Sequence, residues 1–545
     1  MYLLNSIFDK RSDQTLGLQD AQAEFCCSER PKLWYKLKEL RSEISSPPIL
    51  TLFMGKKSSD SAKISLRAFE VTKKELIYRK NTFDSKIKGI LTLDRLRVSI
   101  EPVSCQEAQV LASGFQFKLV AIRDGRFTHV YLKSQEDASL LKEALWGRVI
   151  NTGFYEDFRI DERIGSGGFG KVFKVTRLSD QTKFAAKAFS KSQLLSKPRG
   201  LSILVNEINL TRALDSDRFV QFKAVYETER SVYLIMELLE GGEVFSRFPR
   251  SALSLEEIKH LVRTLLQAVS ELQERKLVHR DLKPGNIMLK YPDRNLLDNK
   301  IKLIDFGLSS AVDGTGYNIL SVCGTPGFIA PEIATLTRKQ IEELTPEVFS
   351  NCDVFSVGSI LFYLLTGDIP FKGQSFEEVL ASNKKCEIDW EDKILQKMDL
   401  DAKDFLKKLL ERDHLKRPRA TEALCHPFLA TESSFKPARE CSNEEGTQEE
   451  TFGNYKSFSE FTLAQDRALI HNINELFDSF TDLADDTDEA PLNSSSHNKP
   501  SQYAFLTKQS PFVEKSESQI AQYRYESLAK KTSRFATKDD QMSPT

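Results

Sequence analysis

The sequence of 545 residues lacks several features that define whole classes of protein. It has no run of about 18 to 20 apolar residues, the length that a membrane-spanning helix needs. Its first residues, MYLLNSIFDKRSDQ, do not follow the basic and then apolar pattern of a secretory signal, and Tyr2 stands where N-myristoylation requires glycine. The formal net charge is only −1, so the whole chain has no electrostatic preference for nucleic acid. These absences predict a cytoplasmic protein that does not bind nucleic acid.

Metal and disulfide signatures are also missing. The eight cysteines are scattered, no CxxC pair occurs, and only Cys26 and Cys27 are neighbours, which argues against a zinc site or a disulfide framework. No loop of the form D-x-D-x-D-G is present, so direct calcium sensing is not expected.

What the chain does contain is ordinary globular composition divided into several segments. A hydrophobic share of 40% and a charged share of 28% are typical of a soluble protein, and the length predicts roughly two to four structural units. Residues 1–47 form a partly helical extension, and residues 48–150 show short alternating strands followed by a helix. Strand-like runs precede a mainly helical stretch over 158–429, and 430–545 is a polar tail with an amphipathic helix near 464–484.

A glycine-rich stretch, RIGSGGFGKVFKV, opens the third segment. Glycine permits tight turns and also lets the backbone approach a ligand closely. A lone G-x-G-x-x-G is therefore about as often a turn as a phosphate cradle, and other residues must decide between the two.

The first residue that helps to decide between a turn and a phosphate-binding loop is a lysine in an apolar strand. Lys187 lies in FAAKAF, where a buried ammonium group must find an anion. Phosphate under the glycine loop would serve, and so would Glu207 in the helical segment LVNEINL.

Acidic and amide side chains follow in two further motifs. LVHRDLKPGNIML contains Asp281, Lys283 and Asn286, and IKLIDFGLS places Asp305 directly after an apolar strand. Carboxylate and amide oxygens suit Mg²⁺, so Asn286 and Asp305 are the candidate metal ligands. Asp281 could accept the proton of an attacking hydroxyl group, and Lys283 could steady phosphate charge. This order of elements predicts phosphoryl transfer, which needs mainly positioning and charge neutralisation.

Residues 158–429 resemble a eukaryotic protein kinase catalytic domain, because GSGGFG, FAAK, HRDLKPGN, DFG, GTPGFIAPE, DVFSVG and KRPRATEAL occur in the family's order and spacing. The resemblance implies a bilobal α+β fold, ATP and Mg²⁺ as cofactors, and protein substrates. It also implies that Asp353 holds the catalytic-loop backbone and that Arg417 pairs with Glu332. The ATP-binding residues that it implies are Ile164, Gly165, Ser166, Gly167, Gly168, Phe169, Gly170, Val172, Ala185, Lys187, Glu207, Met236, Glu237, Leu239 and Glu243.

Within the family, lysine after the aspartate of HRDLKPGN resembles serine/threonine kinases, and CGTPGFIAPEI, LLTGDIPF and HPFL resemble the calcium/calmodulin-dependent group. The resemblance implies that Leu308, which follows DFG, is typical of kinases that prefer serine. It also implies that Met236 is the gatekeeper residue and that Glu243 is an acidic residue that receives a basic side chain of the substrate. Two departures are Gly285, where relatives have glutamate, and a long segment between Glu332 and Asp353. Gly285 removes a carboxylate that would favour basic substrates, which puts that preference in question. The long segment puts the usual shape of the substrate-binding surface in question.

The activation segment suggests a phosphorylation switch. Ser321 stands where related kinases carry a phosphate, and Arg280 is the residue type that would pair with it. Thr325 matches the threonine that contacts the catalytic aspartate.

Residues 48–150 resemble a pleckstrin homology domain, a small antiparallel β-sandwich or barrel that is capped by a helix with a buried tryptophan, here Trp146. This segment holds 18 lysines and arginines against 11 acidic residues. Lys56, Lys57, Lys63 and Arg67 lie around the first turn, where lipid-binding members keep basic residues. The expectation is recruitment to phosphoinositide membranes; a solvated charged face or a protein-docking module are the alternatives.

Other functions remain open on the sequence alone. A kinase fold without catalysis, acting as a lipid- or protein-binding scaffold, is the main alternative. The N-terminal unit could instead shield the cleft, and the helix near 464–484 could restrain the kinase. Deleting residues 430–545 without changing activity would argue against that restraint. The sequence does not define substrates, lipid, activator or oligomeric state.

Overall fold

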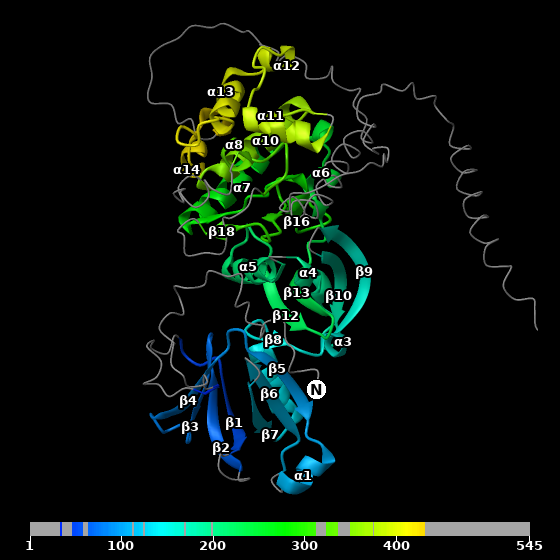
Figure 1. The fold of residues 1–545 in the computed structure, drawn as a ribbon, viewed down its shortest axis with the longest axis vertical. Helices are drawn as coiled ribbons and strands as arrows, with labels where there is room; N and C mark the ends of the chain where they lie inside the picture. Colours follow the sequence, from blue (N-terminus) through cyan, green and yellow to red (C-terminus); the bar gives the residue numbers. More distant parts are fainter. Residues whose placement is uncertain are drawn as a thin grey trace, which may run out of the picture. The chain divides into compact units, whose positions relative to one another are not determined.

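The computed structural model describes residues 33–34, 46–57, 64–111, 114–123, 126–167, 170–197, 200–311, 323–335, 349–373 and 375–430. All of them lie within one compact unit, Met1–Pro491. We divide them into an N-terminal β unit (residues 46–145), a small lobe (150–237) and a large lobe (242–430), which follow one another along the chain (Figure 1).

The N-terminal β unit contains the seven expected strands. They are β1 (Leu50–Lys57), β2 (Ile64–Val71), β3 (Glu75–Arg79), β4 (Ile87–Thr92), β5 (Arg97–Pro102), β6 (Phe117–Arg123) and β7 (Arg126–Leu132). They pair antiparallel in the order β4-β3-β2-β1-β7-β6-β5. Alternation drives this arrangement: Met54 is buried while its neighbour Phe53 is exposed. The unit is compatible with a β-sandwich.

Two helices accompany these strands. Helix α1 (Cys105–Leu111) between β5 and β6 was not anticipated, whereas α2 (Gln135–Leu145) was. The Ser134 side chain caps α2 by accepting a hydrogen bond from the Asp137 N–H. Ala138, Leu141 and Leu145 form its buried face.

The tryptophan prediction was wrong. Trp146 follows the end of α2, and its ring contacts the small lobe, where Nε1 donates to the Tyr226 hydroxyl at 3.2 Å. Trp34 packs against the β unit instead, with its ring edge-on to those of Phe69 and Tyr78 and its Nε1 donating to Thr128. A residue distant in sequence therefore supplies the aromatic ring that the helix was expected to supply.

The small lobe begins with a strand that the sequence analysis assigned to a helix. Val149 and Ile150 are β-branched and follow Gly147, whose φ of 79° ends the helical path. The lobe consists of β8 (Ile150–Asn151), α3 (Phe154–Asp157), β9 (Phe158–Gly167), β10 (Gly170–Arg177), β11 (Lys183–Ser190), α4 (Lys191–Ser196), α5 (Gly200–Ala213), β12 (Phe222–Glu227) and β13 (Ser231–Glu237). Strand β8 pairs parallel with both β5 and β12, so β1–β13 form one continuous sheet.

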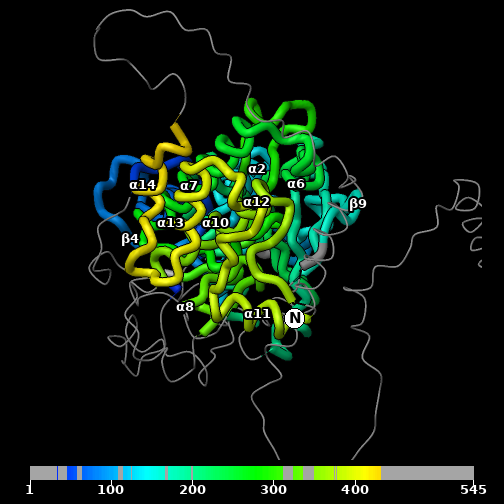
Figure 2. The backbone as a smooth tube through the Cα atoms, turned by 90° about the horizontal axis from the view of Figure 1, so that it is seen from above, coloured from blue at the N-terminus to red at the C-terminus, as the bar shows by residue number. Residues whose placement is uncertain are grey.

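The large lobe is mainly helical and has the largest core of the described residues. Ser254 and Glu257 form a capping box at the start of α7 (Leu255–Glu274), the longest helix among the described residues. Helix α7 contacts α10 (Cys352–Thr366) and α14 (Ala420–Ala423) (Figure 2). The elements are β14 (Gly242–Glu243), α6 (Val244–Arg247), η3 (Arg250–Ala252), α7 (Leu255–Glu274), β15 (Leu277–Val278), η4 (Pro284–Asn286), β16 (Ile287–Leu289), β17 (Ile301–Leu303), β18 (Ser310–Ala311), α8 (Pro331–Ala334), α10 (Cys352–Thr366), α11 (Phe376–Lys385), α12 (Lys393–Gln396), α13 (Leu400–Leu409), α14 (Ala420–Ala423) and η6 (Pro427–Leu429).

Candidate active site

Lys187 joins three elements that are far apart in the sequence. It lies on β11, is 5% exposed, and its Nζ is 2.7 Å from Oε1 of Glu207 on α5 and 3.1 Å from Oδ1 of Asp305. Burial alone would lower the lysine pKa, but the charges of Asp305 and Glu207 overcome it and raise that pKa. Burial raises the pKa of Glu207 to about 7. The cluster therefore satisfies the buried ammonium group, as the sequence predicted.

Asp281 is the centre of a second cluster. Its Oδ1 accepts a hydrogen bond from the Thr325 hydroxyl at 2.5 Å, and its Oδ2 is 3.2 Å from Lys283 Nζ. The Asn286 amide nitrogen donates to the Asp281 carbonyl at 2.7 Å and to Oδ2 at 3.2 Å. These contacts fix the carboxylate between an ammonium group and an amide.

A buried carboxylate binds the backbone of the two residues that precede Asp281. Asp353, at the start of α10, accepts hydrogen bonds from the backbone N–H groups of His279 at 2.7 Å and Arg280 at 2.9 Å. Arg280 has a φ of 66°, which a non-glycine residue adopts only with strain. The Asp353 contacts offset that strain and so orient the next residue, Asp281.

Asp305 follows β17 and also has a left-handed backbone, with a φ of 65°. Its Oδ1 accepts from the Gly307 N–H at 3.2 Å. A side chain on Gly307 would come within 3.2 Å of Glu207 Oε2 and 3.3 Å of Asp305 Oδ1. Glycine therefore lets the two carboxylates approach Lys187 from the same side.

The residues expected to hold a cation have oxygens suited to it. The contacts of Asp305 described above use Oδ1, and those of Asn286 use its amide nitrogen, which leaves one oxygen on each for a ligand. Among the described residues there is no group of three or more His, Cys, Asp or Glu side chains that could hold a metal alone. A pair of oxygen ligands fits Mg²⁺, which binds through one or two protein groups and substrate phosphates.

The glycine-rich stretch forms the β9–β10 hairpin, with Gly167 opposite Gly170. A side chain on Gly170 would lie 2.5 Å from the Ala188 carbonyl oxygen, so the close approach of β11 requires glycine. Ile164 on β9 is 47% exposed. Gly168 and Phe169 lie outside the described residues.

The remaining predicted nucleotide residues lie on β10, β11, β13 and the segment after it. Ala185 and Met236 are opposite one another on β11 and β13. The Glu237 side chain is engaged elsewhere, because it forms ion pairs with Lys302 at 2.6 Å and Lys290 at 2.9 Å. Its side chain is therefore occupied, and nothing in the sequence indicated these partners.

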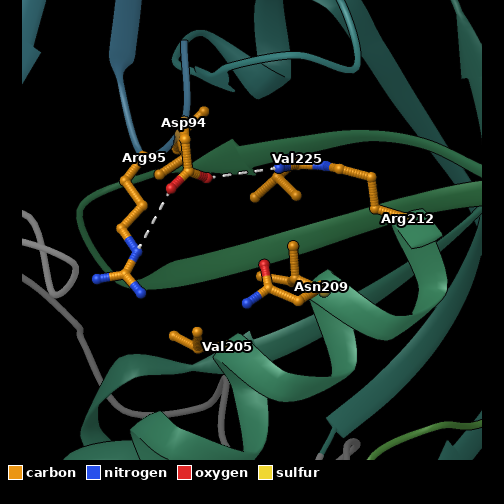
Figure 3. A pocket seen from close by; sticks show the side chains of 8 residues that line it. Asp94, Arg95, Val205, Asn209, Arg212 and Val225 are labelled. Carbon is orange, nitrogen blue, oxygen red and sulfur yellow. Dashed lines mark ion pairs between the residues drawn. The ribbon is translucent and has the colours of Figure 1, made fainter. Parts of the chain in front are cut away.

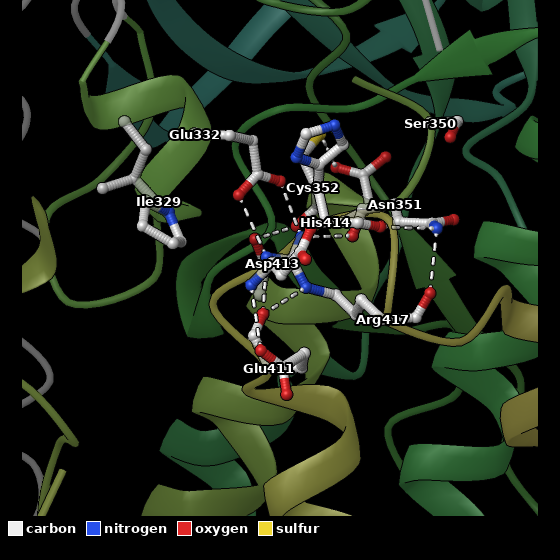
Figure 4. A network of polar contacts seen from close by, with 12 residues as sticks. Ile329, Glu332, Ser350, Asn351, Cys352, Glu411, Asp413, His414 and Arg417 are labelled. Carbon is white, nitrogen blue, oxygen red and sulfur yellow. Dashed lines mark hydrogen bonds and ion pairs between the residues drawn. The ribbon is translucent and has the colours of Figure 1, made fainter. Parts of the chain in front are cut away.

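Arg417 and Glu332 form the expected buried pair (Figure 4). The guanidinium group donates to both carboxylate oxygens, at 2.6 and 3.0 Å. It also donates to the backbone carbonyls of Glu411 and Asn351. Ser321, by contrast, lies outside the described residues, as do Lys63 and the expected helix near 464–484.

Of the proposed lipid-binding residues, Lys56, Lys57 and Arg67 lie in the described part of the chain, and Lys56 and Arg67 lie on the same face of the β1–β2 pair, because Arg67 is opposite Met54. Lys56 and Lys57 are consecutive strand residues, so they point to opposite faces. Lys56 lies 4.6 Å from the Trp34 ring centroid and 5.1 Å from that of Tyr78, and burial lowers its pKa. Arg67 donates to the Leu66 carbonyl oxygen.

One site contact was missed by the sequence analysis. The Asn206 amide on α5 donates to the Ser309 carbonyl oxygen at 2.6 Å, just after DFG. It therefore ties the helix that carries Glu207 to the start of the activation segment. The only feature of the sequence that could have indicated this contact is the position of Asn206 next to Glu207.

Comparison with known proteins gives the same interpretation. Residues 158–429 match the model of the protein kinase domain. Death-associated protein kinase 2 of Homo sapiens is 36% identical over 278 residues, covering 50% of this chain and 72% of that protein. Calcium/calmodulin-dependent protein kinase type 1 of Caenorhabditis elegans is 33% identical over 291 residues, covering 53% and 79%. Myosin light chain kinase A of Dictyostelium discoideum is 30% identical over 278 residues, covering 51% and 89%.

The chain therefore belongs to the protein kinase family. Within it, the chain is a serine/threonine protein kinase that resembles the calcium/calmodulin-dependent group. No helix in the described part of the chain is long and apolar enough to cross a membrane.

Proposed function

We propose that Lys187, Asp281, Asn286 and Asp305 form the active site with which this kinase transfers the γ-phosphate of ATP to serine and threonine hydroxyl groups of proteins. The observation that carries the proposal is the double ion pair of Lys187 with Glu207 and Asp305. It joins β11, which pairs with the glycine-rich hairpin, to α5 and the DFG segment around one ammonium group.

Each residue has a role that its contacts support. Lys187 orients the nucleotide phosphates, and Glu207 holds Lys187 in place. Asp281 accepts the proton of the attacking hydroxyl group, and Lys283 lies 3.2 Å away to balance negative charge. Asp305 and Asn286 would hold Mg²⁺, which neutralises charge on the phosphates. None of the catalytic side chains is replaced, which favours an active kinase over a scaffold.

Calorimetry with Mg²⁺ and ATP on the full chain tests the site. We expect saturable binding that is lost in Lys187→Ala and retained in Lys183→Ala, because Lys183 is exposed at the start of the same strand. An absence of heat with the unaltered chain, or equal binding by Lys187→Ala, would contradict the assignment. Serine and threonine peptide arrays with the same protein would then test the preference for serine that Leu308 implies.

We propose further that phosphorylation of Ser321 activates the kinase through Arg280. The Arg280 side chain is buried, and its Nε donates to the Leu308 carbonyl oxygen at 2.6 Å, next to the DFG segment. A phosphate paired with this guanidinium group would order the activation segment beside Asp281. We expect Ser321→Ala to lower kcat roughly 10-fold, in the range of switch energies of 1–3 kcal/mol. A Ser321→Ala protein as active as the phosphorylated, unaltered protein would show that the switch is absent.

Recruitment to anionic membranes by the N-terminal β unit is a separate proposal. Its support is the excess of basic over acidic residues in 48–150, since each basic group near such a surface contributes about 1 kcal/mol. We expect the full chain to sediment with phosphoinositide vesicles and not with neutral ones, and Lys57→Glu to weaken that binding. Equal sedimentation with both kinds of vesicle would refute it.

A further inference from the structure

Helix α5 contacts both the active site and residues that precede the kinase domain. One side carries Glu207, which pairs with Lys187 in the active site. The other side packs on residues that precede the kinase domain: Leu204 and Ile208 of α5 share a buried cluster with Ile150, which is 5% exposed. Ile150 lies eight positions before the first residue of the matched domain, Phe158.

The position of Ile150 is fixed by its backbone. Strand β8 pairs parallel with β12, placing Ile150 opposite Val225, and with β5, placing it opposite Arg97. The next residue, Asn151, is buried and donates from its side-chain amide to the Val225 carbonyl oxygen at 3.1 Å. Because parallel pairing and this hydrogen bond both hold β8, Ile150 is a rigid support for α5.

A small cavity adjoins this contact. It has a volume of about 30 Å³ and is lined by Ile150 and Val225 on the sheet, by Val205, Asn209 and Arg212 on α5, and by Asp94 of the β unit. Figure 3 shows the side chains of Asp94, Val205, Asn209, Arg212 and Val225 around it. Across it, Asp94 and Arg212 approach to only 3.9 Å, and Asp94 is 72% exposed. Because this cavity adjoins Ile150, shortening the Ile150 side chain would enlarge a gap that is already present beside α5.

A buried ionic chain links the same parts by a second route. Arg97 of β5 is 3.4 Å from Glu227 of β12, and Glu227 is 2.7 Å from Lys191 at the start of α4. Arg97 and Glu227 are 5% and 4% exposed, and α4 contacts α5. The N-terminal β unit thus reaches α5 indirectly, through the pairing of β5 with β8 and through the ionic contact to α4.

We propose that Ile150 is a positioning residue for catalysis. It holds α5 in the place where Glu207 meets Lys187, so that the N-terminal β unit, which pairs with β8 through β5, contributes to the catalytic unit. This inference rests on the proposed role of the Lys187–Glu207 pair.

The test measures steady-state kinetics of the full chain with a peptide substrate. We expect Ile150→Ala to lower kcat/KM for ATP roughly 10- to 100-fold, the range that misplacement of about 1 Å gives, with little change in KM for the peptide. We expect Ile150→Val, which removes only one methyl group and should fold, to retain most of the activity that Ile150→Ala loses. The matched control is Leu132→Ala, which truncates a fully buried residue of the β-unit core without touching α5.

Non-additivity distinguishes positioning from general destabilisation. If Ile150 acts through Glu207, the double variant Ile150→Ala/Glu207→Gln is no slower than Glu207→Gln alone. Additive losses, or an equal loss in Leu132→Ala, would overturn the inference while leaving the kinase assignment intact. An unaltered chain with no kinase activity would instead overturn the proposed function.

Discussion

Replacing Asp281 by asparagine should lower kcat about 10²- to 10⁴-fold, the usual contribution of a general base. Asparagine has nearly the same shape, and its side-chain oxygen can still accept the hydrogen bond from Thr325. It cannot accept the proton of the substrate hydroxyl group, and it removes the charge that pairs with Lys283. We therefore expect KM for ATP to change little, because the proposed nucleotide-binding residue Lys187 is unaltered.

The measurement is transfer of labelled phosphate to peptide by the full chain, in a single-turnover format. Asp293→Asn is the matched control: it is the same substitution at an exposed loop position in the same lobe, and we expect unaltered kcat. An Asp281→Asn protein with kcat within a few-fold of the unaltered chain would show that another group, or none, accepts the proton.

The active-site cluster could be predicted because its chemistry is local. A lysine in an apolar strand needs an anion, and the predicted carboxylate, Glu207, is its partner in the structure. Asp305, which was predicted as a metal ligand, is a second partner. The seven strands of the β unit were equally predictable, since alternating burial depends on neighbouring residues alone.

Tertiary contacts were not predictable in the same way. The side chain that packs against the β-unit core is Trp34 and not Trp146, and no periodicity distinguishes the two rings. The expected helix ran to Ile150, yet pairing with two other strands makes Ile150 and Asn151 the strand β8. The basic set around Lys56 and Lys57 was read along the chain, whereas the pleat places Lys57 on the opposite face from Lys56 and Arg67.

The pair of Arg417 with Glu332 should make the largest single contribution to the stability of the large lobe among the contacts discussed. Arg417 is 2% exposed, and its donors are used by the Glu332 carboxylate and two backbone carbonyls. Arg417→Ala would leave the carboxylate buried without its cation, which typically costs about 3–5 kcal/mol. Because about 1 kcal/mol shifts Tm by roughly 2–4 °C in a domain of this size, we expect Tm to fall by about 10 °C.

Thermal unfolding followed by circular dichroism measures this shift. Arg412→Ala is the control, since this nearby arginine is exposed and its removal should change the free energy of unfolding by no more than about 0.5 kcal/mol. The double variant Arg417→Ala/Glu332→Ala should lose less than the sum of the two single losses, because neither charge is then left unpaired. If Arg417→Ala melts at the temperature of the unaltered chain, the carboxylate must be solvated or protonated at no cost. The pair would then be dispensable for the stability of the lobe, in spite of its geometry.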